Sequence, residues 1–173
     1  MMQDLDLRVP AYQSELYLLR ADDIKIGEIG PVMSSPSSDV VELAAMKLGF
    51  PPPPGRKGGS LFNFRSQGRH FGQSGRCLVP ASAFFEFTGS KYSKAKHRST
   101  LNGAAFTAIS GSVAGKRGKQ SSVVHDADNG AGDDVPGIHS RQIVVPRPED
   151  RRHWLELTKK EAELLRHFAR RAP

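Results

Sequence analysis

The stretch RCLVPASAFFEF, residues 76–87, decides the fold expected for this chain. Its run of apolar and aromatic residues fits a buried strand, which we expect over 77–87. The other apolar runs are also short, and Gly, Pro and Ser separate them, as is typical of strands joined by loops. The further candidate strands are 24–29, 40–48, 61–65, 97–101, 104–110 and 142–145. The sequence therefore predicts a β-rich domain.

Length and composition favour one basic domain. A chain of 173 residues that is 38% hydrophobic can bury one good core, so we expect a single domain over 1–173. Lys and Arg number 25 against 18 Asp and Glu, a formal charge of +7, which favours a polyanionic partner and nucleic acid first. The alternative is a basic but inert surface.

The cysteine count and the chain start bear on the compartment. Cys77 is the sole cysteine of the sequence, which excludes a disulfide framework and a Cys-rich zinc site and indicates a reducing compartment. No apolar run approaches the roughly 20 residues that span a bilayer. The first residues also lack the basic and apolar regions of a signal peptide. We expect a cytoplasmic monomer without membrane association.

Helix signals concentrate near the end of the chain. Thr158 and Glu161 have the spacing of a capping box, and a helix over 159–170 is expected to follow. A shorter helix is expected to start at Pro148, with Trp154 anchoring it to the core. The proline-rich residues 51–59 predict an exposed loop.

The strand expected over 61–65 places an amide and a guanidinium on one face. Asn63 and Arg65 alternate with Phe62 and Phe64, so the polar pair can orient a substrate group and grip a phosphate. The plainer interpretation is a half-buried strand with a polar solvent face. Arg69 and Phe71 follow closely and add positive charge and an aromatic surface for a base.

A single carboxylate stands among phenylalanines at the end of the 76–87 stretch. Glu86 in an apolar setting is expected to have a raised pKa, which suits proton transfer near neutral pH. Alternatively, the alternation of residues 85–87 lets Glu86 point to water. Cys77 fits a buried apolar residue better than a nucleophile.

Two further patterns contain histidine. His139 and Arg141 precede an apolar run, where a histidine can exchange protons and an arginine can hold phosphate. The cluster at 125–128 has the residue types of a metal site but no further ligand at a recognised spacing, so we discount it. We expect no metal and no cofactor.

Taken together, these motifs resemble one family. The order Asn-x-Arg (63–65), then RCLVPAxxFFEF (76–87), then Ile-His-x-Arg (138–141) resembles the SOS response-associated peptidase (SRAP) family, over about residues 3–165. The resemblance implies an α+β fold: a β-rich single domain with a barrel-like core and a few peripheral helices. It also implies a basic cleft for single-stranded DNA that carries an abasic site.

The resemblance further implies a covalent activity. In the family, removal of the initiator methionine exposes a cysteine whose amine and thiol form a thiazolidine with the abasic sugar. By this resemblance, Asn63 positions the terminal residue, Glu86 is the catalytic glutamate and His139 handles protons around the sugar. The phosphate-gripping positions are Arg65, Arg69 and Arg141.

The chain also departs from the family pattern. It opens with Met1 and Met2 where the family has Met-Cys, and internal Cys77 cannot replace a terminal cysteine, so we expect a chain deficient in crosslinking. We infer a truncated N-terminus, an early C-terminus after Leu165, and a doubtful role for Gln67, which stands where a carboxylate is common.

Residues 124–132 suggest a local frameshift. Back-translated and read one nucleotide later, they are compatible with the strand and turn that the family has there, so we expect this segment to lose a core strand. Three functions stay open: an active crosslinking enzyme with an upstream cysteine, a module that only binds single-stranded DNA, and a decayed copy. A conventional Ser or Cys hydrolase lacks a supporting motif.

Overall fold

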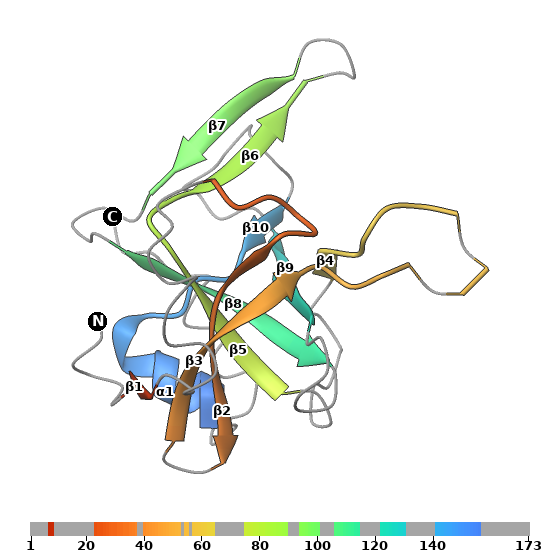
Figure 1. Cartoon of the computed structure of the whole chain (residues 1–173). Coiled ribbons are helices and arrows are strands. Elements are labelled where there is room, and N and C mark those ends of the chain that lie inside the picture. The colour runs from red at the N-terminus through yellow and green to blue at the C-terminus, as the bar shows by residue number, and fades with distance from the viewer. Residues whose placement is uncertain are drawn as a thin grey trace.

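In a computed structural model, the described residues form one main sheet, a separate two-stranded hairpin and a short helix (Figure 1). The structure describes residues 7–8, 23–37, 40–52, 54–55, 57–64, 75–89, 94–100, 106–114, 122–130 and 141–156. Within these ranges, 7–8, 36–37, 64, 114, 122–130 and 141–142 are described by their backbone alone.

Among the described residues, the main sheet has eight strands. Across it lie, in order, β1 (Leu7–Arg8), β3 (Val40–Leu48), β2 (Ile29–Ser37), β5 (Gly75–Ala81), β8 (Thr107–Ala114), β9 (Ser122–Gly130) and β10 (Arg141–Ile143). The eighth strand, β4 (Asn63–Phe64), pairs with β9 beside this path. Neighbours from β3 to β10 run antiparallel, whereas β1 is parallel to β3 and β4 is parallel to β9.

The sheet curls until β3 meets β9. Lys47 pairs with Ser122 and Leu48 with Val123, in a parallel ladder of two residue pairs. The ladder stops where the chain turns at Gly49, whose φ of 98° is a left-handed conformation that favours glycine. The expected α+β class is confirmed. The barrel-like core is corrected to a curled sheet that is not closed into a barrel, because so short a ladder does not seal its edges.

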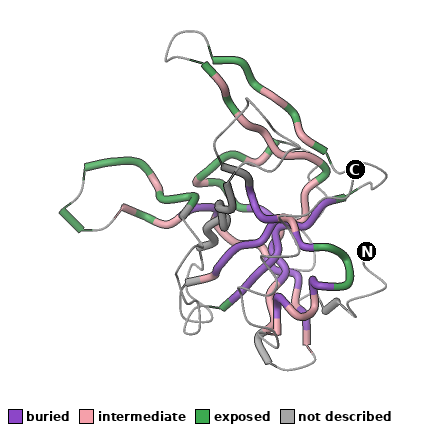
Figure 2. The backbone as a smooth tube through the Cα atoms, turned by 180° about the vertical axis from the view of Figure 1, so that it is seen from behind, coloured by how far each residue is buried: buried purple, intermediate pink, exposed green. Residues whose placement is uncertain are grey.

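The core occupies both faces of β5. Residues 76–79 are buried without interruption, as expected for a central strand covered on both sides. One face carries a cluster around Met33, Leu78 and Trp154, and the other a cluster around Val32, Cys77 and Ile109. Figure 2 shows the buried backbone, in purple, in the body of the molecule and away from the projecting hairpin. The expectation that Cys77 is a buried apolar residue is confirmed.

A short helix covers the first of these clusters. The 3-10 turn η2 (Pro148–Asp150) leads into α1 (Arg151–Glu156), so the helix predicted to start at Pro148 is confirmed. Trp154 is fully buried, and its indole Nε1 donates to the Cys77 carbonyl oxygen at 3.0 Å. The guanidinium of Arg76 stacks 4.8 Å from the Trp154 ring. The predicted anchoring role of Trp154 is therefore confirmed.

The hairpin stands apart from the main sheet. It consists of β6 (Phe84–Thr88) and β7 (Ala95–Ser99), paired antiparallel (Figure 1). Phe84, at its base, packs against the second core cluster, while the rest extends outward and is largely exposed or half-buried (Figure 2). The hairpin is thus attached at one end and accessible along its length.

Several strand predictions change in detail. The strand over 40–48 is confirmed, and those over 97–101, 104–110 and 142–145 are displaced to β7, β8 and β10. The prediction of a single strand over 77–87 is wrong, because residues 82–83 are not in a strand and separate β5 from β6. The strand over 24–29 is also wrong: Gly27 has a φ of 92°, and the Glu28 amide donates to the Lys25 carbonyl oxygen at 3.0 Å, which makes a turn.

Residues 122–130 form a strand despite their unusual composition. β9 pairs with β8 along one edge and with β3 and β4 along the other, and β10 pairs with its residues 127–130. The expected loss of a core strand in this segment is therefore wrong, because backbone pairing on both edges holds it in the sheet. Residues 51–52, 54–55 and 57–59 belong to an arm that is mostly exposed, as predicted for the proline-rich loop. The helix expected over 159–170 lies outside the described residues.

Candidate functional site

Asn63 lies in a short strand at the end of the proline-rich arm. Phe50 and Leu61 exchange backbone hydrogen bonds of 2.7 and 2.9 Å, which close the base of the arm directly before β4. Asn63 then pairs with His125 of β9 and its side chain is exposed. Leu61 and Phe62 are exposed too, and of the described residues 61–64 of the strand expected over 61–65, only 63 and 64 are strand.

Three segments pair with β9 in succession along its length. The end of β3 pairs with residues 122–123, β4 with 125–126 and β10 with 127–130. Arg141 pairs with Gly130, so its backbone is five residues of β9, or about 16 Å, from the position opposite Asn63. Asn63 and Arg141 therefore both belong to strands that pair with β9, without being immediate neighbours.

Glu86 lies on the projecting hairpin. It is half-buried and directly opposite His97 in the antiparallel pair, so both side chains belong to one face. On the same face, Thr88 Oγ1 and His97 Nε2 are hydrogen-bonded at 2.7 Å. Glu86 is thus neither buried in an apolar core nor fully exposed to water. Its neighbour His97 is titratable and was not among the site residues predicted from the sequence.

The other face of the hairpin combines aromatic and basic side chains. Phe85 lies opposite Arg98 and Phe87 opposite Lys96, and Lys96, Arg98 and Phe87 are exposed. The Lys96 ammonium is 3.6 Å from the centre of the Phe85 ring, within cation–π range. We call these four residues the basic hairpin face. Sequence reasoning missed it, although the alternating basic residues at 94–98 carried the signal.

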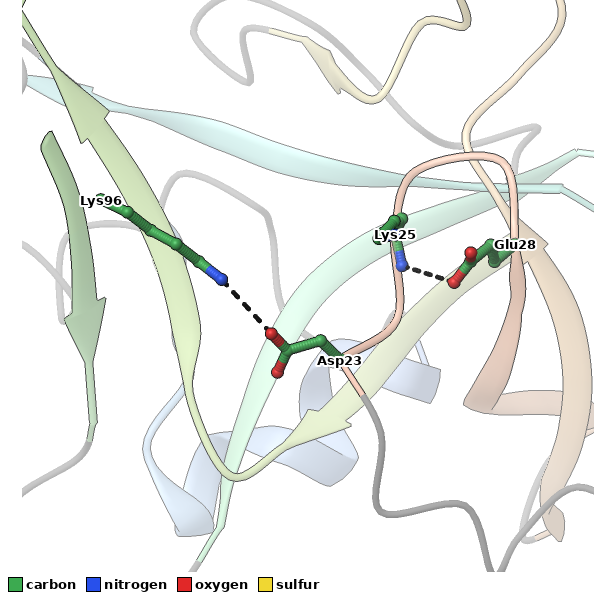
Figure 3. A network of polar contacts seen from close by, with 4 residues as sticks. All are labelled: Asp23, Lys25, Glu28 and Lys96. Carbon is green, nitrogen blue, oxygen red and sulfur yellow. Dashed lines mark hydrogen bonds and ion pairs between the residues drawn. The ribbon is translucent and has the colours of Figure 1, made fainter. Parts of the chain in front are cut away.

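One ion pair connects this face to the body of the molecule. Lys96 Nζ lies 3.3 Å from Asp23 Oδ2, and both side chains are about half exposed or more (Figure 3). The segment that carries Asp23 is fixed by a turn in which the Lys25 amide donates to Glu28 Oε2 at 2.9 Å. The turn therefore holds a carboxylate beside the Lys96 ammonium.

The remaining predicted site residues are not placed. Arg65, Arg69, Phe71 and His139 lie outside the described residues, as does the side chain of Arg141. Of the predicted set, the structure thus describes Asn63 and Glu86 with their side chains, on β4 and β6 respectively.

The described residues contain no group of three His, Cys, Asp or Glu side chains able to hold a metal ion. Residues 125–128, discounted as a metal site, lie in β9, where only the backbone is described. Within the described ranges, no helix has the length and apolar character to cross a membrane.

Comparison with known proteins identifies relatives of this chain. The family model described as SOS response associated peptidase (SRAP) matches residues 18–173. A phage-related protein from Bordetella bronchiseptica has a similar solved structure, with a TM-score of 0.66 at 23% identity over 84% of this chain and 75% of that one. A second protein from the same organism gives 0.65 at 22% identity, over 100% and 89% of the two chains.

A more distant structure comes from Bacteroides thetaiotaomicron. Its TM-score is 0.57 at 17% identity, over 82% of this chain and 68% of that one. No curated protein matches the chain. At these identities, the structural neighbours support the fold alone.

Proposed function

The chain belongs to the SOS response associated peptidase (SRAP) family, and on that basis we propose that it binds single-stranded DNA carrying abasic sites. The observation that supports this most directly is the hairpin that carries Glu86, since its opposite face presents Lys96, Arg98 and the exposed Phe87. Cations contact phosphates and aromatic rings stack on unpaired bases, so this combination suits a single strand.

The proposed pocket uses the residues that match the family motifs. Asn63, on β4, positions the terminal residue, Glu86 is the catalytic glutamate, and His139 handles protons around the sugar. Arg65, Arg69 and Arg141 hold the flanking phosphates, and Phe71 stacks on a base. In support, Asn63 is exposed and therefore accessible to a ligand, and Glu86 is half-buried beside His97, away from bulk water on one side.

The covalent step of the family requires an N-terminal cysteine. Its amine condenses with the sugar aldehyde and releases water, and its thiol then adds to the imine carbon to close the ring. Cys77 cannot perform this step, because it is internal and its side chain is fully buried. We therefore propose that the residues of this domain bind DNA reversibly by themselves, and that a Met-Cys segment placed before them supports crosslinking.

Two measurements test the binding proposal. Arg65→Ala is expected to weaken binding to an abasic single strand in fluorescence anisotropy, and to lower the slope of log affinity against log salt by about 0.7, the value of one phosphate contact. Lys57→Ala, an equal charge change on the exposed arm, is the matched control. Equal slopes for the wild-type protein and Arg65→Ala would contradict the assignment.

A denaturing gel tests the covalent step. The chain is expected to give no stable band with abasic DNA, and the version preceded by Met-Cys is expected to give one. A band from the chain itself would mean that another nucleophile, such as the terminal amine, reacts. A decayed copy predicts neither binding nor crosslinking in either version.

A further inference from the structure

We propose that the strand β7 is a second phosphate-binding track, which extends the DNA footprint beyond the pocket at Asn63 and Glu86. The inference rests on the proposed single-strand binding and adds to it a surface on β7. Its occupant is the backbone of the same DNA strand after it leaves the pocket.

The charge of β7 is concentrated on one side. Lys96 and Arg98 alternate along the strand, so they share a face, and exposed Lys94 precedes them. From Lys94 to Arg98 the chain spans about 13 Å, which at about 3.4 Å per stacked nucleotide corresponds to about four nucleotides. The track is therefore long enough to add several nucleotides to a binding site.

The position of the hairpin makes this charge available. β6 and β7 form their own two-stranded sheet, attached to the body at Phe84 and extending away from it (Figure 1). Glu86 and Lys96 lie on neighbouring strands but on opposite faces of this two-stranded hairpin, so a DNA strand held at Glu86 reaches the basic hairpin face by crossing the hairpin edge. Exposed Phe87, directly opposite Lys96, adds an apolar surface beside the cations.

Asp23 regulates the charge of this track. It pairs with Lys96 at 3.3 Å, but both side chains are well exposed, and ion pairs of this kind contribute little stability. A phosphate can therefore replace the Asp23 carboxylate on Lys96 at small cost. Removal of the cations is therefore expected to weaken DNA binding, and removal of Asp23 to strengthen it. An ion pair with a purely structural role would not produce these opposite effects on affinity.

The test compares charge variants of the full chain by fluorescence anisotropy with oligo-dT of about 4 to 16 nucleotides. The variant Lys96→Gln with Arg98→Gln removes two track charges, and Lys47→Gln with Lys57→Gln removes two charges elsewhere on the described surface. The track variant is expected to lower the salt slope by about 1.4, at about 0.7 per contact, which is about 25-fold in affinity at 0.1 M salt. The loss is expected with long oligonucleotides and not with the shortest.

Asp23→Asn is expected to change the binding affinity in the opposite direction. It is expected to tighten binding to long oligonucleotides, whereas Glu149→Gln, which neutralises an exposed carboxylate on η2, is expected to change it less. Equal slopes for the track variant and its control would overturn the inference even if Arg65→Ala weakens binding. Loss at every length alike, or tighter binding to duplex of the same length, would also overturn it. A wild-type chain that binds no single strand would overturn the proposed function as well.

Discussion

At the scale of single residues, Trp154 connects the helix α1 to the central strand β5. Its ring lies in the cluster with Met33 and Leu78, its indole donates to the Cys77 carbonyl, and Arg76 stacks on it. The Arg76 guanidinium also donates to the Trp154 carbonyl at 3.4 Å. A helix of six residues is too short to be stable alone, so these contacts hold α1 on the sheet.

Trp154→Phe keeps an aromatic ring but removes the indole donor. The buried Cys77 carbonyl then loses this partner, so the free energy of unfolding is expected to fall by about 1 to 3 kcal/mol, as measured by urea denaturation. Phe106→Leu is the control, since Phe106 is exposed and such changes stay within about 0.5 kcal/mol. A similar small loss for both variants would contradict the anchoring role.

At the scale of elements, the hairpin is held together by polar contacts and the main sheet by burial. The hydrogen bond of Thr88 to His97 links β6 to β7 across the pair. In β8, Thr107 is buried instead, and its Oγ1 has no hydrogen-bond partner among the described residues. The two threonines therefore differ in what their hydroxyl groups contribute.

Thr88→Val and Thr107→Val test that difference with one substitution. Thr88→Val is expected to lower the free energy of unfolding by about 0.5 to 1.5 kcal/mol, because His97 loses its partner. Thr107→Val is expected to be neutral or stabilising, because a buried hydroxyl without a partner is replaced by a methyl group. Denaturant unfolding measures both, and a reversed order would contradict the hydrogen-bond assignment.

At the scale of the whole molecule, stability is expected to decrease from the sheet centre outward. β5 and β8 pair over seven residues between the two core clusters, whereas the hairpin has a single ladder and none of its strand residues is fully buried. Local opening costs least where few apolar contacts are lost. The same arrangement leaves the hairpin free to adjust to a ligand.

Hydrogen–deuterium exchange measures this hierarchy. Amides of β5 and β8 are expected to exchange most slowly and those of β6 and β7 orders of magnitude faster, since their opening free energies differ by several kcal/mol. Slower exchange in the hairpin on addition of single-stranded DNA would locate the ligand there. Equal protection of hairpin and sheet in the free protein would contradict the separation of the two units.

The sequence by itself determined the class of the fold, the buried part of the central strand but not its end, the helix at Pro148 and the family. These follow from local patterns: the continuous apolar run at 76–79 fits a strand buried on both faces, and Pro148 fits a helix start. Only the tertiary structure decided that residues 122–130 join the sheet, because strand pairing depends on partners distant in the chain. The same holds for the basic hairpin face, since register alone sets Phe87 opposite Lys96 and Glu86 opposite His97.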